Sequence, residues 1–241
     1  MIKEALEYIV GLRAPVVKEI DESMYSDNDL KRISYNPLAE PLQLHTLTGL
    51  VDYIKSNVDK TKNGENLIVE VASPEKVYLY TSLDKERKRE KFAIVEARVP
   101  SFPFNTFIGH EEFIINVQAK FLDDNNSDRA KILSFAGTVE KGSVAEYSDD
   151  GVSQKATVKS GIINKEEKIV PNPVKLRPYR TFLEVEQPMS EFIFRMKDKD
   201  YGVSCAVIEA DGGAWINAAT KNIKEYLEFE LSEFKNILII S

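Results

Sequence analysis

The chain of 241 residues is 43% hydrophobic and 29% charged, which gives it enough apolar side chains for a sizeable core and excludes disorder of the whole chain. Its net charge of -7 and isoelectric point near 5.1 oppose unguided binding to polyanions, so nucleic-acid binding requires a local basic patch. The single cysteine, Cys205, leaves no partner for an internal disulfide, and with only two histidines the composition argues against a Cys/His zinc site.

The beginning of the sequence bears on where the protein resides. The string MIKEALEYIVGLRAP has acidic residues inside its apolar pattern, so it lacks the uninterrupted apolar core of a signal peptide. No run in the chain approaches the roughly 18 to 20 apolar residues that a membrane helix needs. We therefore expect a cytoplasmic protein that has no membrane partner.

The first 45 residues predict an N-terminal helix followed by an extended arm. Apolar residues at helical spacing indicate a short amphipathic helix that ends at Gly11, and such a helix must dock on something. The stretch 15–44 has weak periodicity, a polar SDND cluster and two prolines, which favour an extended connector. We assign residues 1–45 to this arm.

Residues 46–100 predict a helix and then a small antiparallel meander. Thr48 is a plausible N-cap for a helix that ends by Asn63-Gly64. Two β-rich runs follow on either side of a turn centred on Pro74, and the run FAIVEARV supplies a third strand beyond a charged link.

The remainder predicts two helices, several strands and a final helix. The strings HEEFIINVQAKFL and SDRAKILSFAG have helical spacing, whereas EFIFRMK and VSCAVIEA flank a turn, and a helix from Trp215 to about Leu227 precedes the apolar run NILIIS. Helices and strands arrive in blocks, which favours an α+β fold with mostly antiparallel sheet and helices packed on it. We assign residues 46–241 to one such domain.

Sequence motifs for catalysis are largely missing. Nothing matches the Walker A spacing or the dinucleotide-binding glycine pattern, and GVSQK has only the first glycine of a nucleophile elbow. His110 precedes two glutamates, but no second histidine follows one turn later, so it fits the start of a helix better than a zinc site. We predict no cofactor and favour a protein that is not an enzyme.

One acidic constellation keeps an enzymatic alternative open. Glu184 and Glu186 alternate on one side of a predicted strand, and Glu209 and Asp211 alternate on one side of another. Two such pairs on adjacent strands could bind Mg²⁺ in a metal-dependent nuclease or a cyclic-nucleotide phosphodiesterase. The competing interpretation is a solvated sheet face, with Asp211-Gly212-Gly213 reversing the chain.

A charged loop is the candidate for contact with nucleic acid. Lys85, Arg87, Lys88 and Arg89 could grip a phosphate backbone at the tip of a hairpin. The glutamates between them equally fit a solvated loop. Three phenylalanines in the nearby segment SFPFNTF could stack on bases if they are exposed, although such residues more often form a core.

The second half of the chain resembles a known family. The strings DDGVSQKATVKSGI, PNPVKLRPYRTFLEVEQPMSEFIFR and IEADGGAWINAATKNIKEYL are similar to blocks of an uncharacterised phage and prophage protein family typified by the YfdQ protein. The resemblance covers roughly residues 46 to 235 and is most specific at 178–188. It implies a phage or prophage origin, among early genes of DNA metabolism and host takeover, and it transfers no catalytic residue.

The same block suggests a binding surface. It combines a fixed cation, aromatic rings and hydrogen-bond acceptors, and with a nearby tryptophan the candidates are Tyr179, Arg180, Glu184, Glu186, Gln187 and Trp215. A buried pair between Arg180 and a glutamate that orders the fold is the alternative.

These observations lead to one preferred hypothesis and two alternatives. The preferred hypothesis is an early-type phage accessory protein in the cytoplasm of the host bacterium that acts by binding, as a homo-oligomer, in phage DNA recombination or replication or in countering host defence. Its expected partners are nucleic acid or a host defence component. An edge strand such as NILIIS invites pairing with another chain. The alternatives are the metal-dependent enzyme and a virion structural component.

Overall fold

The computed structural model describes residues 2–11, 17–20, 23–26, 38–59, 66–84, 87–141, 144–149, 154–160, 164–169, 172–199 and 202–241. The chain forms two compact units, residues 1–39 and 40–241. The fold class is α+β, as the sequence predicts. None of the described helices has the length and apolar character needed to cross a membrane.

The described part of the first unit contains one helix and one hairpin. Helix α1 (Ile2–Gly11) has the predicted amphipathic pattern, and none of its residues is buried. Strands β1 (Val17–Ile20) and β2 (Ser23–Ser26) pair antiparallel within the stretch that the sequence assigns to an extended arm.

The second unit contains a five-stranded sheet built from both ends of its sequence. Its strands are β3 (Leu42–Leu44), β4 (Leu67–Ser73), β5 (Lys76–Thr81), β6 (Lys91–Glu96) and β14 (Ile237–Ile240), in the spatial order β14-β4-β5-β6-β3. The predicted meander β4-β5-β6 is antiparallel, and the two outer strands each add in parallel, β14 to β4 and β3 to β6. Because β3 pairs with β6, residues 42–44 belong to this sheet, although their weak periodicity predicts that they belong to the arm.

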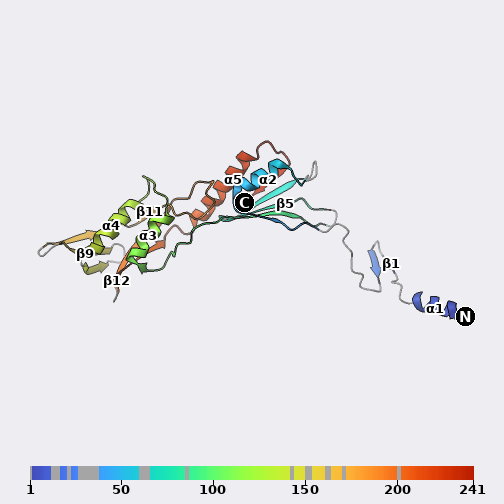
Figure 1. The fold of residues 1–241 in the computed structure, drawn as a ribbon, viewed down its shortest axis with the longest axis horizontal. Helices are drawn as coiled ribbons and strands as arrows, with labels where there is room; N and C mark the ends of the chain where they lie inside the picture. The colour runs from blue at the N-terminus through green and yellow to red at the C-terminus, as the bar shows by residue number, and fades with distance from the viewer. Residues whose placement is uncertain are drawn as a thin grey trace. The chain divides into compact units, whose positions relative to one another are not determined.

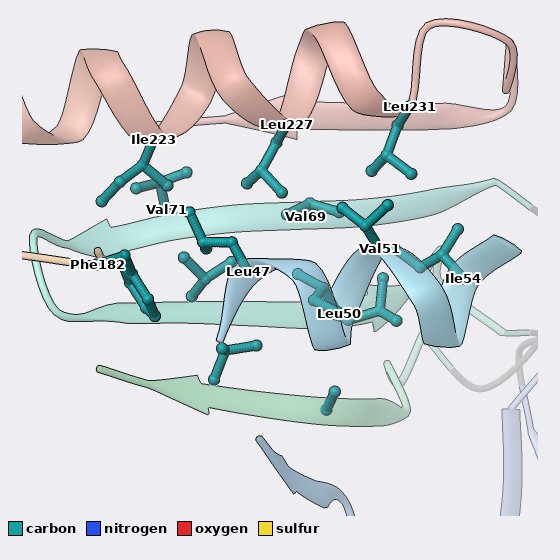
Figure 2. Packing of buried hydrophobic residues seen from close by; sticks show 14 of the residues in the cluster. Leu47, Leu50, Val51, Ile54, Val69, Val71, Phe182, Ile223, Leu227 and Leu231 are labelled. Carbon is teal, nitrogen blue, oxygen red and sulfur yellow. The ribbon is translucent and has the colours of Figure 1, made fainter. Parts of the chain in front are cut away.

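Helices α2 (Leu47–Ser56) and α5 (Ala214–Glu230) lie on one face of this sheet (Figure 1). Figure 2 shows Leu50 and Val51 of α2 and Leu227 of α5 directed at strand residues such as Val69. Alternating residues of β4 and β5 are buried beneath the helices, as period-2 apolar strands require. We call this side the covered face.

The N-cap of α2 differs from the predicted residue. Thr46 caps the helix, because its hydroxyl accepts a hydrogen bond from Gly49 N at 3.1 Å. Thr48, the predicted cap, lies inside the first turn, where its backbone N–H donates to Glu184 at 3.2 Å. Both threonines precede Leu50, where the predicted apolar stripe begins, so spacing alone does not separate them.

A second hydrophobic cluster forms around a four-stranded antiparallel sheet. Its order is β11 (Val174–Leu176), β12 (Ser190–Lys199), β13 (Gly202–Glu209) and β7 (Ile108–Gly109). Helices α3 (His110–Lys120) and α4 (Arg129–Lys141) contribute Phe113, Val117 and Ile132 to this cluster. The predicted hairpin β12-β13 and both predicted helices are therefore confirmed. A separate three-stranded antiparallel sheet joins β8 (Val144–Asp149), β9 (Gln154–Ser160) and β10 (Asn164–Ile169).

Candidate binding surface

The block 178–188, which contains most of the binding candidates predicted from the sequence, is a loop organised by one buried side chain. The Oε1 atom of Gln187 accepts hydrogen bonds from the backbone N–H groups of Arg180 at 3.0 Å and Thr181 at 3.3 Å. Its Nε2 atom donates to the carbonyl oxygens of Phe182 at 2.9 Å and Val185 at 3.4 Å. The side chain thus replaces the partners that a strand ladder would supply. We call residues 178–188 the Gln187 loop.

The Gln187 loop contacts both hydrophobic clusters of the second unit. Phe182 and Val185 belong to the hydrophobic cluster between the covered face and helices α2 and α5. The Thr181 hydroxyl donates to the carbonyl oxygen of Pro74 at the β4–β5 turn. The guanidinium of Arg180 lies 5.5 Å from the centre of the Phe192 ring, which belongs to the second cluster. The loop is therefore a structural element of the fold.

Arg180 is buried, and its charge is used inside the protein. The residue is 6% exposed, and its guanidinium lies 3.9 Å from the centre of the Trp215 ring. It forms an ion pair with Glu209 at 2.9 Å and donates to the hydroxyl of Ser190. Burial lowers the pKa of Arg180 to about 10, and the Glu209 and Asp211 carboxylates act in the opposite direction. This geometry matches the alternative interpretation, a buried pair that orders the fold.

The other candidates from this block separate into local contacts. The half-buried Tyr179 donates its backbone N–H to the carbonyl of Lys120, and Glu186 pairs with Arg177 at 2.7 Å. Glu184 accepts the hydrogen bond from Thr48 N described above. Arg180, Gln187 and Trp215 converge, whereas Tyr179, Glu184 and Glu186 make separate contacts.

The four carboxylates of the enzymatic alternative do not gather at one point. Glu184 and Glu186 lie in the Gln187 loop, so the prediction that they alternate on a strand is wrong, because prolines at 178 and 188 lack N–H donors and Gln187 satisfies the backbone between them. Asp211 lies just before α5, where its carboxylate accepts hydrogen bonds from Gly213 N at 3.0 Å and Trp215 N at 3.3 Å. Among the described residues, no group of three or more His, Cys, Asp and Glu side chains could hold a metal ion.

The charged loop between β5 and β6 is exposed at its described basic residues. Lys85 lies outside the described residues, whereas Arg87, Lys88 and Arg89 are all exposed. Asp84 shapes the turn by accepting from Lys88 N at 2.8 Å. Arg87 takes a left-handed backbone with φ of 60°, which reverses the chain at the tip of the loop.

Two further sequence candidates have structural roles. Phe102 and Phe104 pack in the second cluster, with Phe104 stacked on Phe192 at a centroid distance of 5.5 Å, so they are core residues and do not offer exposed rings to bases. His110 begins α3, as the simpler interpretation predicts, and its Nε2 atom lies 2.9 Å from the carbonyl oxygen of Ala136.

The side of the five-stranded sheet opposite α2 and α5 carries two rows of partly exposed residues. Strand pairing aligns one row as Leu238, Ile68, Tyr80 and Lys91. The other row is Ile240, Glu70, Tyr78 and Ile94. We call these eight residues the open face, because their exposure contrasts with the burial of the alternate strand residues.

A tyrosine pair with a lysine occupies the centre of the open face. The rings of Tyr78 and Tyr80 lie 5.7 Å apart, and Lys91 Nζ is 4.3 Å from the centre of the Tyr78 ring. Burial raises the pKa of the Tyr80 hydroxyl above its usual value, and the nearby Glu70 carboxylate raises it further. The phenol therefore remains neutral at physiological pH. The arrangement presents aromatic surface and one cation together.

The sheet also ends in an apolar strand whose outer edge is unpaired among the described strands. β14 pairs with β4 on one side only. Leu238 is 56% exposed and Ile240 is 42% exposed, and the strand sequence ILII has no charged residue to discourage pairing. Since Leu67 N donates to Asn236 O, the alternation along the strand directs the backbone groups of Ile237 and Ile239 to the outer edge.

Sequence reasoning identified the apolar run of β14 but missed the tyrosine pair. The alternation in KVYLYT places Tyr78 and Tyr80 on one side of β5. The side of the sheet that stays exposed is decided by where α2 and α5 pack. Because α5 is far from β5 in the sequence, the local pattern of β5 does not predict it.

Comparison with known proteins yields no match to a protein-family model, a curated protein or a solved structure.

Proposed function

We propose that this chain is a phage or prophage accessory protein that acts by binding and assembles into a homo-oligomer through the edge of β14. The phage setting rests on the resemblance of residues 46–235 to the YfdQ-type family. The assembly rests on one observation, the uncharged and exposed apolar edge strand at residues 237–240.

The pairing of two β14 strands is self-complementary. An antiparallel pair about a twofold axis at Leu238 brings Ile237 of each copy opposite Ile239 of the other, where both residues direct their backbone groups outward. The same pairing brings the two Leu238 side chains together on the open face and covers apolar surface that is 56% exposed in one copy. The two sheets then form one continuous sheet.

Binding is favoured over catalysis by the contacts of the polar side chains. Each acidic candidate already has a partner inside the protein, which is an arginine, a backbone N–H at the start of α5 or the backbone N–H of Thr48. Arg180 is paired with Glu209. Among the described residues of the second unit, the open face and the edge of β14 present aromatic, basic and apolar groups that are at least partly exposed.

The test is the molar mass of the full chain by size-exclusion chromatography with light scattering. We expect a dimer or larger species at micromolar concentration. Leu238→Lys places two positive charges opposite each other and should give a monomer. Leu42→Lys makes the same substitution on the opposite edge strand, where Leu42 is 43% exposed, and should leave the mass unchanged.

A second pair of variants isolates the backbone contribution. Ile239→Pro removes an N–H that faces outward, which an edge strand tolerates, and should also give a monomer. Ile239→Ala removes the same side-chain packing but keeps the N–H, and should remain associated. A wild-type chain that is monomeric at micromolar concentration contradicts the proposal.

A further inference from the structure

We propose that the open face of the five-stranded sheet, together with the adjoining basic loop, binds single-stranded nucleic acid. The inference goes beyond self-assembly and does not depend on it, since every residue it uses belongs to one copy of the chain. Tyr78 and Tyr80 are the stacking residues, and Lys91, Lys88 and Arg89 are the phosphate contacts.

The aromatic part of the surface suits unpaired bases. Successive bases of a single strand stack on neighbouring aromatic rings of an exposed sheet, an interaction open to every base because each has a π face. Tyr78 and Tyr80 are two residues apart on one strand, with ring centres 5.7 Å apart. Ile68 and Ile94 flank the pair in the two rows and add apolar surface on either side.

The charge of the surface is arranged to receive a phosphate backbone. Lys91 lies over the two tyrosine rings, and the described residues give it no carboxylate partner. The exposed Arg87, Lys88 and Arg89 continue from the same end of the sheet, because the β5–β6 loop starts directly after the strand that carries Tyr80. A local concentration of cations overcomes the acidic average of the chain at this place.

The acidic groups on this side of the sheet are already engaged. Glu70 is hydrogen-bonded to the Tyr80 hydroxyl. Glu96 forms an ion pair with Lys76 at 3.2 Å. Duplex nucleic acid fits less well, since its paired bases cannot reach the tyrosine rings.

The experiment is fluorescence anisotropy of the full chain with labelled oligo-deoxythymidine, its ribose counterpart and a DNA duplex of equal length, at low salt. We expect both single strands to bind more tightly than the duplex, and their ratio shows which sugar is preferred. The double substitution of Tyr78 and Tyr80 by Ala should weaken single-strand binding about tenfold or more. The corresponding double substitution by Phe keeps both rings and should bind like the wild type.

The charge contribution has its own matched control. Lys88→Ala with Arg89→Ala should lower the slope of log affinity against log salt by about 0.7 for each phosphate that the variant no longer neutralises. Lys221→Ala with Lys224→Ala removes the same charge from the outer side of α5 and should leave the slope unchanged. The Ile239→Pro variant should bind as a monomer, which separates this proposal from self-assembly.

Three results overturn the inference. They are the absence of wild-type binding to either single strand at low salt, unchanged affinity in the alanine variant, and a duplex affinity equal to that for single strands. The loop variant keeps the test decisive if the alanine variant unfolds, because an unchanged salt slope would contradict the phosphate contacts.

Discussion

The two faces of the five-stranded sheet use the same strands for opposite purposes. On the covered face, Val69 and Leu79 are fully buried under α2 and α5 and supply folding free energy. On the open face, Tyr78 and Tyr80 come from the same β5 strand yet keep part of their surface exposed. The difference shows that strand alternation alone produces a stabilising face and an accessible face, and that the placement of two helices decides which is which.

The largest expected effect separates neighbouring residues of β5. Leu79→Ala removes a fully buried side chain and should lower the free energy of unfolding by about 2 to 5 kcal/mol. Tyr80→Ala, on the open face, should cost about 1 kcal/mol. Urea unfolding of the two variants measures both values, and equal costs would mean that the two faces are equally buried in solution.

A somewhat smaller effect concerns the Gln187 loop, which contributes Phe182 to the covered face. Gln187→Ala leaves two buried N–H groups and two carbonyl groups without their partner, and should lower the free energy of unfolding by about 3 kcal/mol. Gln118→Ala on the exposed side of α3 is the control and should be neutral within about 0.5 kcal/mol. If both substitutions are neutral in urea unfolding, the loop does not secure the covered face.

The smallest effect reports on the second cluster, where Cys205 is fully buried. Burial raises the pKa of this thiol from its usual 9.0 to about 12. The folded state therefore keeps the proton that the unfolded state releases above pH 9.0, and this contribution to stability is lost as the pH rises from 9.0 towards 12.

Unfolding measured against pH detects this contribution. Between about pH 9 and pH 10.5, the stability of the wild type relative to Cys205→Ala should fall by about 2 kcal/mol. The alanine variant lacks the thiol and so controls for tyrosine and lysine titration. A pH-independent difference between the two proteins would show that the thiol has the same pKa in the folded and unfolded states, and would contradict its burial in the second cluster.

Local patterns predicted much of the fold. Runs of β-forming residues beside turns located β4, β5, β6, β12 and β13, and helical spacing located α3, α4 and α5. Interactions between distant residues were not predictable in the same way. The parallel pairing of β14 with β4 joins segments at opposite ends of the second unit, and the Gln187 loop resembles a strand until the hydrogen bonds of its buried amide are known.

The candidate site shows the same division. The basic loop follows directly from its charges, whereas the tyrosine pair becomes a surface only because α2 and α5 pack on the other side of the sheet. Arginine is a common binding residue, so the sequence suggests Arg180 as a candidate. The Trp215 ring and Glu209, which come from distant segments, bury it.

The edge of β14 carries the central claim, and amide hydrogen exchange at Ile239 tests it most directly. Its N–H faces the outer edge, whereas the N–H of Leu238 faces β4 and serves as an internal reference. We predict that exchange at Ile239 slows as protein concentration rises into the micromolar range while Leu238 remains protected throughout. Fast exchange at Ile239 at every concentration would contradict assembly through β14.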